Sequence, residues 1–343
     1  MDRKVLREIA TQLESYASRQ GGKLVVDEHS AEVDPLRFQP LKSPAMEGAV
    51  VFVDGGQATL LESPTFFLQF VRVAVVQYEG QKRAGIKRTE AYTLTTLAEK
   101  EGKRVFATAV FPAEDAGDKG GKDIALREIP DIAQDDPTVK SGMHAVTPQQ
   151  VGLVVRKLIE LDVMDHACRR TEAGTLVVRD GDLVSRASCE LGVLQTLYNH
   201  VGRGVLIAGL SKTTHAFTTT GNAATSALLR IGALEPWHYP HHAQGLVDVG
   251  FVKLHEKSAY AFRLDTVKDA RVIGGMLITH ASDPVFIGYP YGLVQADEFG
   301  RVTHKEQEGL LLMFMHAAQE KYPYLVQEMR SLDAHSILDR IKA

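Results

Sequence analysis

Two apolar runs in this chain each end in an aspartate followed by glycine. The first run ends at Asp54 and the second at Asp180. A strand that ends this way holds its carboxylate at the edge of a sheet, and the glycine lets another backbone or a phosphate come close. Either aspartate alone would indicate only a turn, because Asp-Gly is common turn chemistry. Together, two carboxylates from one sheet can bind a divalent metal ion.

The segments around these aspartates predict a fixed order of strands and helices. After the strand that ends at Asp54, β-type runs follow at residues 65–79 and 104–111. Thr147, with Pro and two Gln after it, then starts a helix that reaches about Cys168. A strand (175–180), a helix (about 187–201) and a strand (204–210) come next. Three strands, helix, strand, helix, strand is the order of the ribonuclease H-like fold, in which three antiparallel strands precede strands that arrive through helical crossovers.

Helices are also predicted at both ends of the chain. Residues 2–19 carry an apolar stripe typical of an amphipathic helix. Near the C-terminus, Pro290 suits the first position of a short helix, and residues 303–306 form a capping box before another. Three short strands are expected near 246–254, 259–264 and 272–279. The predicted fold class is mixed α/β: a ribonuclease H-like core, its mixed sheet flanked by helices, with additional N-terminal and C-terminal helices.

Two regions follow from this order. Residues 1–46 form an N-terminal helical segment, and residues 47–330 form the main domain. Residues 112–146 are rich in Gly, Asp and Lys with a weak apolar pattern, which predicts a loop insertion.

Composition excludes several classes of protein. The 343 residues are 44% hydrophobic and 24% charged, as in an ordinary globular chain. No apolar run reaches the ~18 residues of a membrane span. The charged N-terminus lacks a signal-peptide core, and Cys168 and Cys189 have no metal-type spacing, so we expect a reducing, cytoplasmic setting. The net charge of −4 means that any nucleic-acid contact must use a local basic surface.

A third carboxylate is expected from the helix before the second strand aspartate. Glu160 heads a stripe that can pack on the sheet. Asp162 and Asp165 are rivals, because they align with the apolar stripe of the preceding turns. A solvent-facing helix surface that carries all three acids is the alternative to a site.

The motifs and their order resemble the NurA family, the nuclease partner of the hexameric HerA translocase. They are the apolar run before Asp54-Gly55, the helical Glu160, the sequence Asp180-Gly181-Asp182-Leu183, and a late motif that begins at Tyr289-Pro290. The family's late motif reads Tyr-Pro-x-Pro-Leu-x-x-Ala-His. This chain has Gly292 in place of the second proline and Asp297 in place of the histidine.

The resemblance implies a set of site residues. The metal ligands would be Asp54, Glu160 and Asp180, with Asp297 as a fourth carboxylate in the histidine's position. Tyr289 would lie near the phosphate, as would Lys212, because such chains often carry a lysine after this strand. A tyrosine packed beside a helix start and an ordinary exposed lysine are the alternatives for these two.

The resemblance also implies an activity. The chain would be a two-metal-ion deoxyribonuclease that uses Mn²⁺ or Mg²⁺, the ions that hard carboxylate oxygens suit. It would be a homodimer that cuts single-stranded DNA as an endonuclease and digests DNA ends as an exonuclease. It would work with a HerA-type hexameric ATPase in DNA repair or defence. The departures at Gly292 and Asp297 motivate a second hypothesis, a catalytically impaired adaptor that docks on a translocase. An actin-like sugar or acetate kinase shares the Asp-Gly strand end but would need further glycine-rich phosphate loops.

Two other clusters stand out. The basic stretch at residues 81–88 is the best candidate for contact with a DNA backbone, although a solvated hairpin tip would look the same. His238, His241 and His242 crowd one segment, but no helical spacing or acidic partner supports a metal site there.

Overall fold

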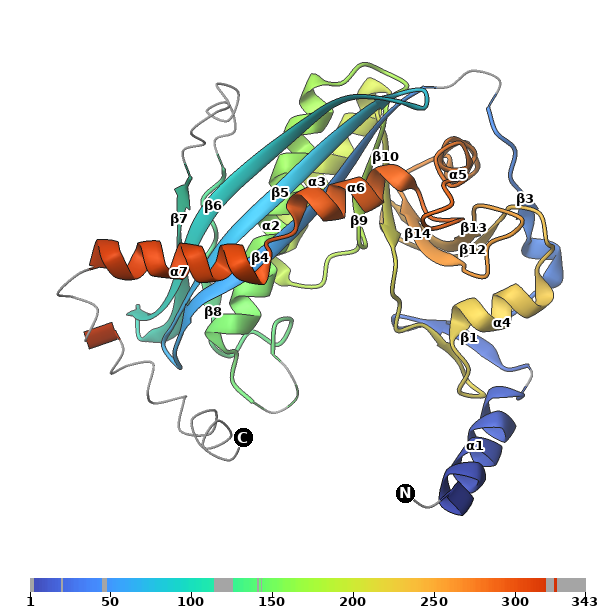
Figure 1. Cartoon of the computed structure of the whole chain (residues 1–343), viewed down its shortest axis with the longest axis horizontal. Coiled ribbons are helices and arrows are strands. Elements are labelled where there is room, and N and C mark those ends of the chain that lie inside the picture. The colour runs from blue at the N-terminus through green and yellow to red at the C-terminus, as the bar shows by residue number, and fades with distance from the viewer. Residues whose placement is uncertain are drawn as a thin grey trace.

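We describe the chain from a computed structural model (Figure 1), which describes residues 3–19, 21–44, 48–113, 126–140, 142, 144–318 and 324–325. Within these residues, eleven strands form one large sheet in the order β3-β12-β13-β14-β10-β9-β4-β5-β6-β7-β8. Three further strands form a small sheet in the order β11-β1-β2.

The centre of the large sheet has the predicted topology. Strands β4 (Ala49–Glu62), β5 (Phe66–Glu79) and β6 (Lys82–Lys100) are antiparallel neighbours. Strands β9 (Leu176–Asp180) and β10 (Leu206–Ser211) lie on the other side of β4 and run parallel to it. The ribonuclease H-like core is therefore confirmed.

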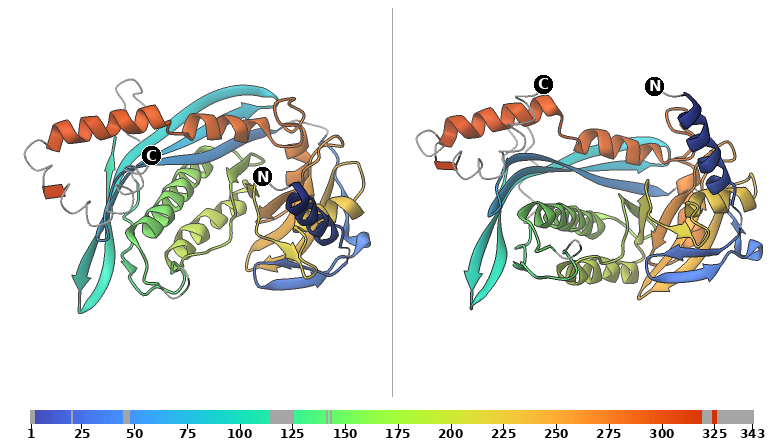
Figure 2. Two further views of the ribbon diagram at one scale, coloured as in Figure 1. Left: turned by 60° about the horizontal axis from the view of Figure 1, so that its bottom comes forward. Right: turned by 90° about the horizontal axis from the view of Figure 1, so that it is seen from below.

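One face of the sheet is covered by the helices between these strands (Figure 2). Helix α2 (Pro148–Arg170) begins at the predicted capping box, in which Thr147 and Gln150 bond each other's backbone. Helix α3 (Leu191–Tyr198) lies between the 3₁₀ turns η3 (Ser188–Glu190) and η4 (Asn199–Arg203). Buried residues of α2 and α3, such as Val155 and Leu194, pack against apolar residues of β4 and β5 in a single cluster.

The C-terminal helices cover the opposite face. Helices α5 (Ala270–Ile278) and α6 (Tyr291–Gly300) pack on β4, β9 and β10 through residues such as Leu277 and Leu293. Helix α7 (His304–Ala318) follows, with its predicted capping box between Thr303 and Glu306, and covers the far ends of β4 and β5. The core thus has two layers, one on each side of the sheet.

The remaining elements extend the sheet and add the small one. In the large sheet they are β3 (Gln39–Pro40), β7 (Lys103–Pro112), β8 (Ile132–Ala133), β12 (Trp237–Gln244), β13 (Val247–Lys253) and β14 (Phe262–Thr266). Elsewhere they are α1 (Arg3–Ala17), β1 (Lys23–Val26), β2 (His29–Glu32), η1 (Pro35–Arg37), β11 (Phe217–Thr218) and α4 (Ala224–Ile231).

The third strand of the core is not the one the sequence predicts. Strand β6 is the third, and the run at residues 104–111 belongs to the fourth, β7. The first half of β6 is polar and exposed, and two of its buried residues, Thr93 and Thr95, are threonines. Its sequence therefore lacks the apolar alternation by which a half-buried strand is found.

Three further predictions are wrong in detail. Strand β4 does not end at Asp54 but continues to Glu62; only its parallel partner β9 stops there. The strand expected at 272–279 is helix α5, whose buried Ile273, Met276 and Leu277 follow helical spacing in a short apolar run that suits either structure. Pro290 caps α6 from outside and does not occupy its first position.

The N-terminal segment contains strands β1, β2 and β3 as well as its predicted helix. Helix α1 has no buried residue and projects from the body beside the small sheet (Figure 1). Its stripe residues Leu6 and Leu13 are 44% and 60% exposed, so the stripe does not pack on the chain's own core. Of the insertion predicted at 112–146, residues 114–125, 141 and 143 lie outside the described residues. Among the described helices, none is long and apolar enough to cross a membrane.

Candidate active site

Asp54 and Asp180 lie side by side on neighbouring parallel strands. The pairing of β4 with β9 ends at Val53 opposite Arg179, so each aspartate is the next residue on its strand. Paired residues of a parallel sheet point to the same face, and the next residues point together to the other face. Both carboxylates therefore lie on the side covered by α6. β9 ends at Asp180, whereas β4 continues to Glu62.

Lys212 holds three carboxylates together. It follows the last residue of β10, as predicted, and its ammonium Nζ lies 2.5 Å from Asp180 Oδ2. The same atom lies 3.3 Å from Asp297 Oδ1 and 3.8 Å from Asp54 Oδ2. The acids come from β9, α6 and β4, so one cation joins three elements that are far apart in the chain. Burial lowers the pKa of Lys212, but the three carboxylates outweigh it and raise the pKa above its usual value.

Asp54 is the most buried of the three aspartates. It is 8% exposed and accepts a hydrogen bond from the Gly55 backbone N–H. Burial, followed by the charges of Asp180 and Glu160, raises its pKa to about 8, which Lys212 only partly offsets. A carboxyl group with this pKa gains from any further positive charge placed beside it.

Asp297, by contrast, is well compensated. Its carboxylate pairs with Lys212 and with Arg301, one helical turn further along the chain. Burial raises the pKa of Asp297, but these two cations outweigh it and lower the pKa below the usual value. Asp297, which stands where the late motif of the resembled family has histidine, thus lies in the cluster through its contact with Lys212.

Glu160 reaches the cluster from the opposite layer. It is 2% exposed, and a Cβ atom on Gly55 would lie 2.5 Å from its Oε1. The absence of that Cβ is what allows the carboxylate to approach Asp54. Glu160 accepts a hydrogen bond of 2.7 Å from Arg179 and pairs with Arg156. It is therefore neutralised by two arginines of its own chain.

Asp162 and Asp165, the alternatives to Glu160 on α2, form their contacts with other residues. Asp162 pairs with Arg127, and Asp165 binds Arg127, Arg169 and His200. These contacts tie α2 to the segment before it and to η4. Of the three acids on the helix, Glu160 is the one whose charge acts on Asp54.

Tyr289 lies beneath the carboxylates. It is fully buried, and the ammonium of Lys212 is 5.5 Å from the centre of its ring. Its hydroxyl is near Asp180 but makes no well-formed hydrogen bond to any described residue. Burial and the neighbouring aspartates raise the pKa of Tyr289 well above its usual value, so the hydroxyl keeps its proton. The buried position is that of a tyrosine packed beside a helix start, and the role near a phosphate stays a prediction.

Two glycines let α6 approach the sheet. A Cβ on Gly292 would collide with the Phe52 ring, and a Cβ on Gly56 would collide with the Gly300 carbonyl. Gly292, where the family has proline, therefore brings α6 directly onto β4. This contact places Asp297 beside the two strand aspartates.

The arginines of the site were not predicted from the sequence. Arg156 and Arg301 each stand four residues from a site acid, a spacing that brings side chains together on a helix and could have revealed them. Arg179 directly precedes Asp180, and its buried charge pairs across layers, which no local pattern indicates.

We compared the chain with known proteins. No family model and no curated protein matches the sequence. The crystal structure of the NurA nuclease from Sulfolobus solfataricus matches with a TM-score of 0.52 and 12% identity, over 93% of this chain and 99% of that one. The chain has the fold of NurA. The likeness to NurA that the motifs predict is therefore confirmed at the level of the fold.

Two endonuclease V structures have lower TM-scores than NurA. Endonuclease V of Ciona intestinalis, in complex with DNA, has a TM-score of 0.39 and 12% identity over 90% of this chain and 100% of its own. The catalytic domain of human endonuclease V has a TM-score of 0.33 and 10% identity over 87% and 95%.

The candidate site has the donor chemistry for a divalent cation. Asp54, Asp180 and Asp297 supply hard oxygen donors, and all three face one ammonium group. As they lie in this structure, no three His, Cys, Asp or Glu side chains of the described residues are arranged to hold a metal ion. The carboxylates therefore fit a cation on one condition: Lys212 must withdraw from the space between them.

The raised pKa of Asp54 predicts a gain in stability when its charge is removed. Because its folded-state pKa of about 8 lies above the ordinary value of 3.8, the folded chain loses stability as pH rises between these values. In the presence of chelator, Asp54→Asn should melt several degrees above the native chain at about pH 9, since 1 kcal/mol moves Tm by ~2–4 °C in chains of comparable size. At about pH 4 the two should melt together.

Asp297→Asn is the matched control, because Asp297 is paired and its pKa is lowered. It should show no gain at either pH. Equal melting of native and Asp54→Asn protein across the whole pH range would show that the pKa of Asp54 is not raised in the folded chain.

Proposed function

We propose that this chain is a metal-dependent deoxyribonuclease that hydrolyses phosphodiester bonds. The observation that carries the proposal is the convergence of Asp54, Asp180 and Asp297 on one ammonium, in a chain with the NurA fold. The charge of Glu160, in the α2 layer, also acts on Asp54. Acids from a central strand, its parallel neighbour and two helices are the donor set that phosphodiester hydrolysis by two metal ions requires. Mn²⁺ or Mg²⁺ suits these donors.

Each residue of the site has a role in this proposal. A divalent cation held by Asp54 and Asp180, with Glu160 and Asp297 beside them, would supply an activated water and charge for the leaving oxygen. Lys212, once freed from the carboxylates, can pair with a phosphate oxygen. The Tyr289 hydroxyl stays protonated and can donate a hydrogen bond at the floor of the site. Arg179 and Arg156 hold Glu160 in place from the α2 side.

The first part of β6 is the proposed contact for the DNA backbone. Arg83 and Arg88 lie over the Phe299 ring at 5.8 and 5.3 Å from its centre. Phe299 belongs to α6, two residues after Asp297, so the basic stretch runs beside the site. Exposed basic side chains around an aromatic ring suit a nucleic-acid strand, which offers phosphates and stacking bases.

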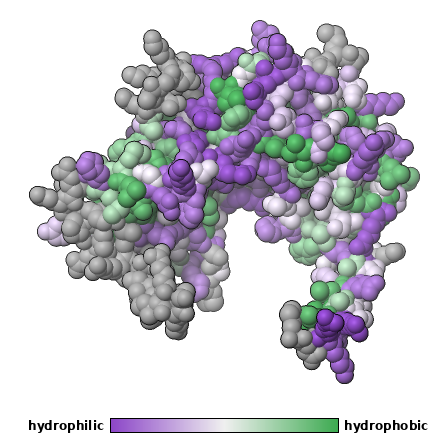
Figure 3. Space-filling model, in the orientation of Figure 1, coloured by the Kyte–Doolittle hydropathy of each residue, from purple (hydrophilic) through white to green (hydrophobic). Residues whose placement is uncertain are grey.

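A partner and a second copy belong to the same proposal. Exposed apolar side chains, such as Leu13 on α1 and Leu312 on α7, offer surfaces for them, and Figure 3 shows apolar residues gathered at both helices. We assign these surfaces to a homodimer and to a HerA-type hexameric ATPase acting with it at DNA ends, in repair or defence in the cytoplasm. The net charge of −4 gives the free chain little attraction for DNA, so a translocating partner would deliver the strand.

One observation favours the alternative function, an adaptor with an impaired site. Every site carboxylate already faces a cation of the chain: Lys212 for the three aspartates and two arginines for Glu160. A site neutralised in this way has less need of a metal ion. The cleavage experiment below separates the two functions.

Replacing a strand aspartate should abolish cleavage without unfolding the chain. Asp54→Asn and Asp180→Asn each remove a charged donor, and the loss of activity should be at least about a hundredfold. The measurement is digestion of end-labelled DNA in Mn²⁺, Mg²⁺ or chelator, with and without a HerA-type ATPase. The native chain should cleave weakly alone and faster with the ATPase.

Variants on α2 provide the comparison. Glu160→Gln should be as inactive as the strand variants, whereas Asp162→Asn should keep its activity because Asp162 pairs with Arg127 away from the site. No cleavage by the native chain with any metal ion and the ATPase would favour the adaptor. Full activity of both strand variants would eliminate the site.

Removing the basic pair Arg83 and Arg88 on β6 should weaken binding to DNA of any base sequence. The double variant Arg83→Gln and Arg88→Gln should lower the slope of log K against log salt by ~0.7–0.9 for each lost phosphate contact. The control is Lys103→Gln with Arg104→Gln, two exposed cations at the far end of the β6–β7 hairpin. If both double variants gave the same slope of log K against log salt, the DNA backbone would not bind at the first part of β6.

A further inference from the structure

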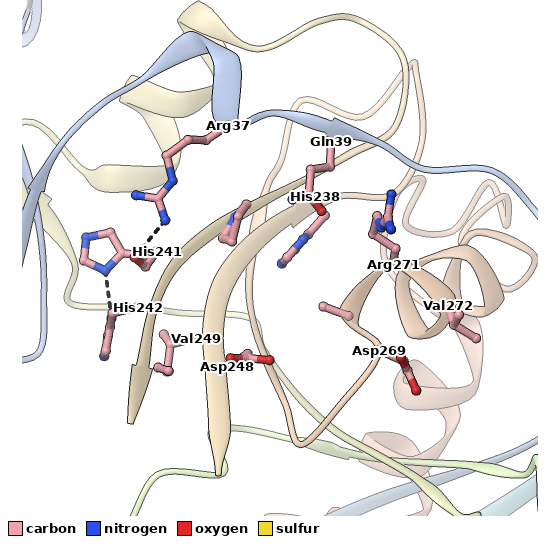
Figure 4. A pocket seen from close by; sticks show the side chains of 13 residues that line it. Arg37, Gln39, His238, His241, His242, Asp248, Val249, Asp269, Arg271 and Val272 are labelled. Atoms are coloured by element: carbon pink, nitrogen blue, oxygen red, sulfur yellow. Dashed lines mark hydrogen bonds between the residues drawn. The ribbon is translucent and has the colours of Figure 1, made fainter. Parts of the chain in front are cut away.

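A pocket lies far from the carboxylates in the sheet order, at the edge formed by β3, β12 and β13. It has a volume of about 440 Å³ and opens between the strands and the start of α5 (Figure 4). A hollow of this size suits a small molecule such as a nucleotide. None of the residues assigned to the candidate active site lines it.

The start of α5 offers free backbone N–H groups to this pocket. The first helical bond runs from the Ile273 N–H to the Asp269 carbonyl, so the amides of residues 270–272 have no partner within the helix. Asp269, at φ 54°, makes no capping bond with its side chain. Ala270, Arg271 and Val272 all line the pocket. Free amides at a helix start favour a negatively charged group.

His238 is a second and independent sign of a ligand. It is 4% exposed, lines the pocket, and its Nδ1 has no hydrogen-bond partner among the described residues. Figure 4 shows its ring in the middle of the lining residues, between Arg271 and the pair His241 and His242. A Cβ on Gly250 would lie 2.7 Å from the ring's Nε2, so the imidazole packs directly over that glycine. A buried polar atom without a partner costs free energy unless something binds it.

The charged groups around the ring suit a ligand with both acidic and polar parts. Arg37 is fixed by its bond to the His241 carbonyl and by the Tyr239 ring. Arg271 is exposed and forms no ion pair with the described residues, so its guanidinium can turn to a ligand. Asp248 and Asp269 also line the pocket, and their carboxylates can accept hydrogen bonds from hydroxyl or amino groups.

Burial, with Arg271 nearby, lowers the pKa of His238 to about 4. The imidazole is therefore neutral near pH 7 and can donate one hydrogen bond or accept one.

We propose that this pocket binds a phosphate monoester attached to a nucleoside. The phosphate lies at the start of α5, beside Arg271. His238 forms a hydrogen bond with the ligand from the floor of the pocket. Asp248 and Asp269 accept hydrogen bonds from the sugar or the base of the nucleoside. A free mononucleotide and the 5′-phosphate end of a DNA strand share this chemistry. The pocket is thus a nucleotide site separate from the carboxylate cluster.

Calorimetric titration of the full chain tests the proposal. The probes are inorganic phosphate, adenosine 5′-monophosphate, adenosine, and one short oligonucleotide with and without a 5′-phosphate. The monophosphate should bind more tightly than inorganic phosphate, and adenosine should not bind. Binding of the monophosphate identifies a free nucleotide as the ligand, and binding of the phosphorylated oligonucleotide alone identifies a DNA end.

Two variants test the geometry without disturbing the core. Val272→Asp puts a carboxylate into the exposed first turn, where an acid is compatible with the helix but repels a bound anion. Arg271→Gln removes the free cation. Each should weaken phosphate binding about tenfold with little change in Tm. Val285→Asp, at a valine 72% exposed outside the pocket, is the control and should bind as the native chain does.

The outcome does not depend on cleavage of DNA. Asp54→Asn, which lies outside this pocket, should bind adenosine 5′-monophosphate as the native chain does, even if the nuclease proposal fails. The proposal is overturned if no phosphate probe binds, or if the native chain, Val272→Asp and Arg271→Gln bind the probes equally well.

Discussion

The site depends on one cation between three carboxylates. Asp54, Asp180 and Asp297 come from three elements, and their charges would drive these elements apart if nothing lay between them. The Lys212 ammonium supplies the opposing charge, yet it does not satisfy Asp54, whose pKa stays at about 8. Burial, together with the charges of Asp180 and Glu160, raises this pKa, so a further positive charge beside Asp54 would stabilise its ionised form. A site that served stability alone would gain from a neutral residue at Asp54.

The fold creates this concentration of charge in three ways. The register of β4 with β9 sets two aspartates next to each other where β9 ends. Gly55 and Gly292 leave out the Cβ atoms that would hold Glu160 and α6 away. Arg156 and Arg179 then neutralise Glu160 from the α2 layer, so each layer of the core contributes both an acid and its counter-charge. The geometry of the site is therefore a property of the packing as a whole.

Local sequence signals predicted the parts of this arrangement that depend on neighbouring residues. The capping box at Thr147 and the Asp-Gly run at Asp180 marked their elements correctly, because caps and turns are decided within a few residues. The sequence of β6 does not indicate a strand, because polar side chains fill its exposed face. The short apolar run of α5 suits a strand as well as a helix. The arginines around Glu160 and the pocket beside His238 depend on contacts between distant segments, which a single sequence does not display.

The most direct measurement is the position of Mn²⁺ in a crystal of the native chain. An anomalous difference map at the manganese edge should show density beside Asp54 and Asp180, with the Lys212 ammonium moved out from between them. That result would show that the lysine occupies the place of a metal ion. A map without density near these residues, and with Lys212 still in contact with Asp180 in excess Mn²⁺, would contradict the account and leave the cluster as an internal ion-pair network.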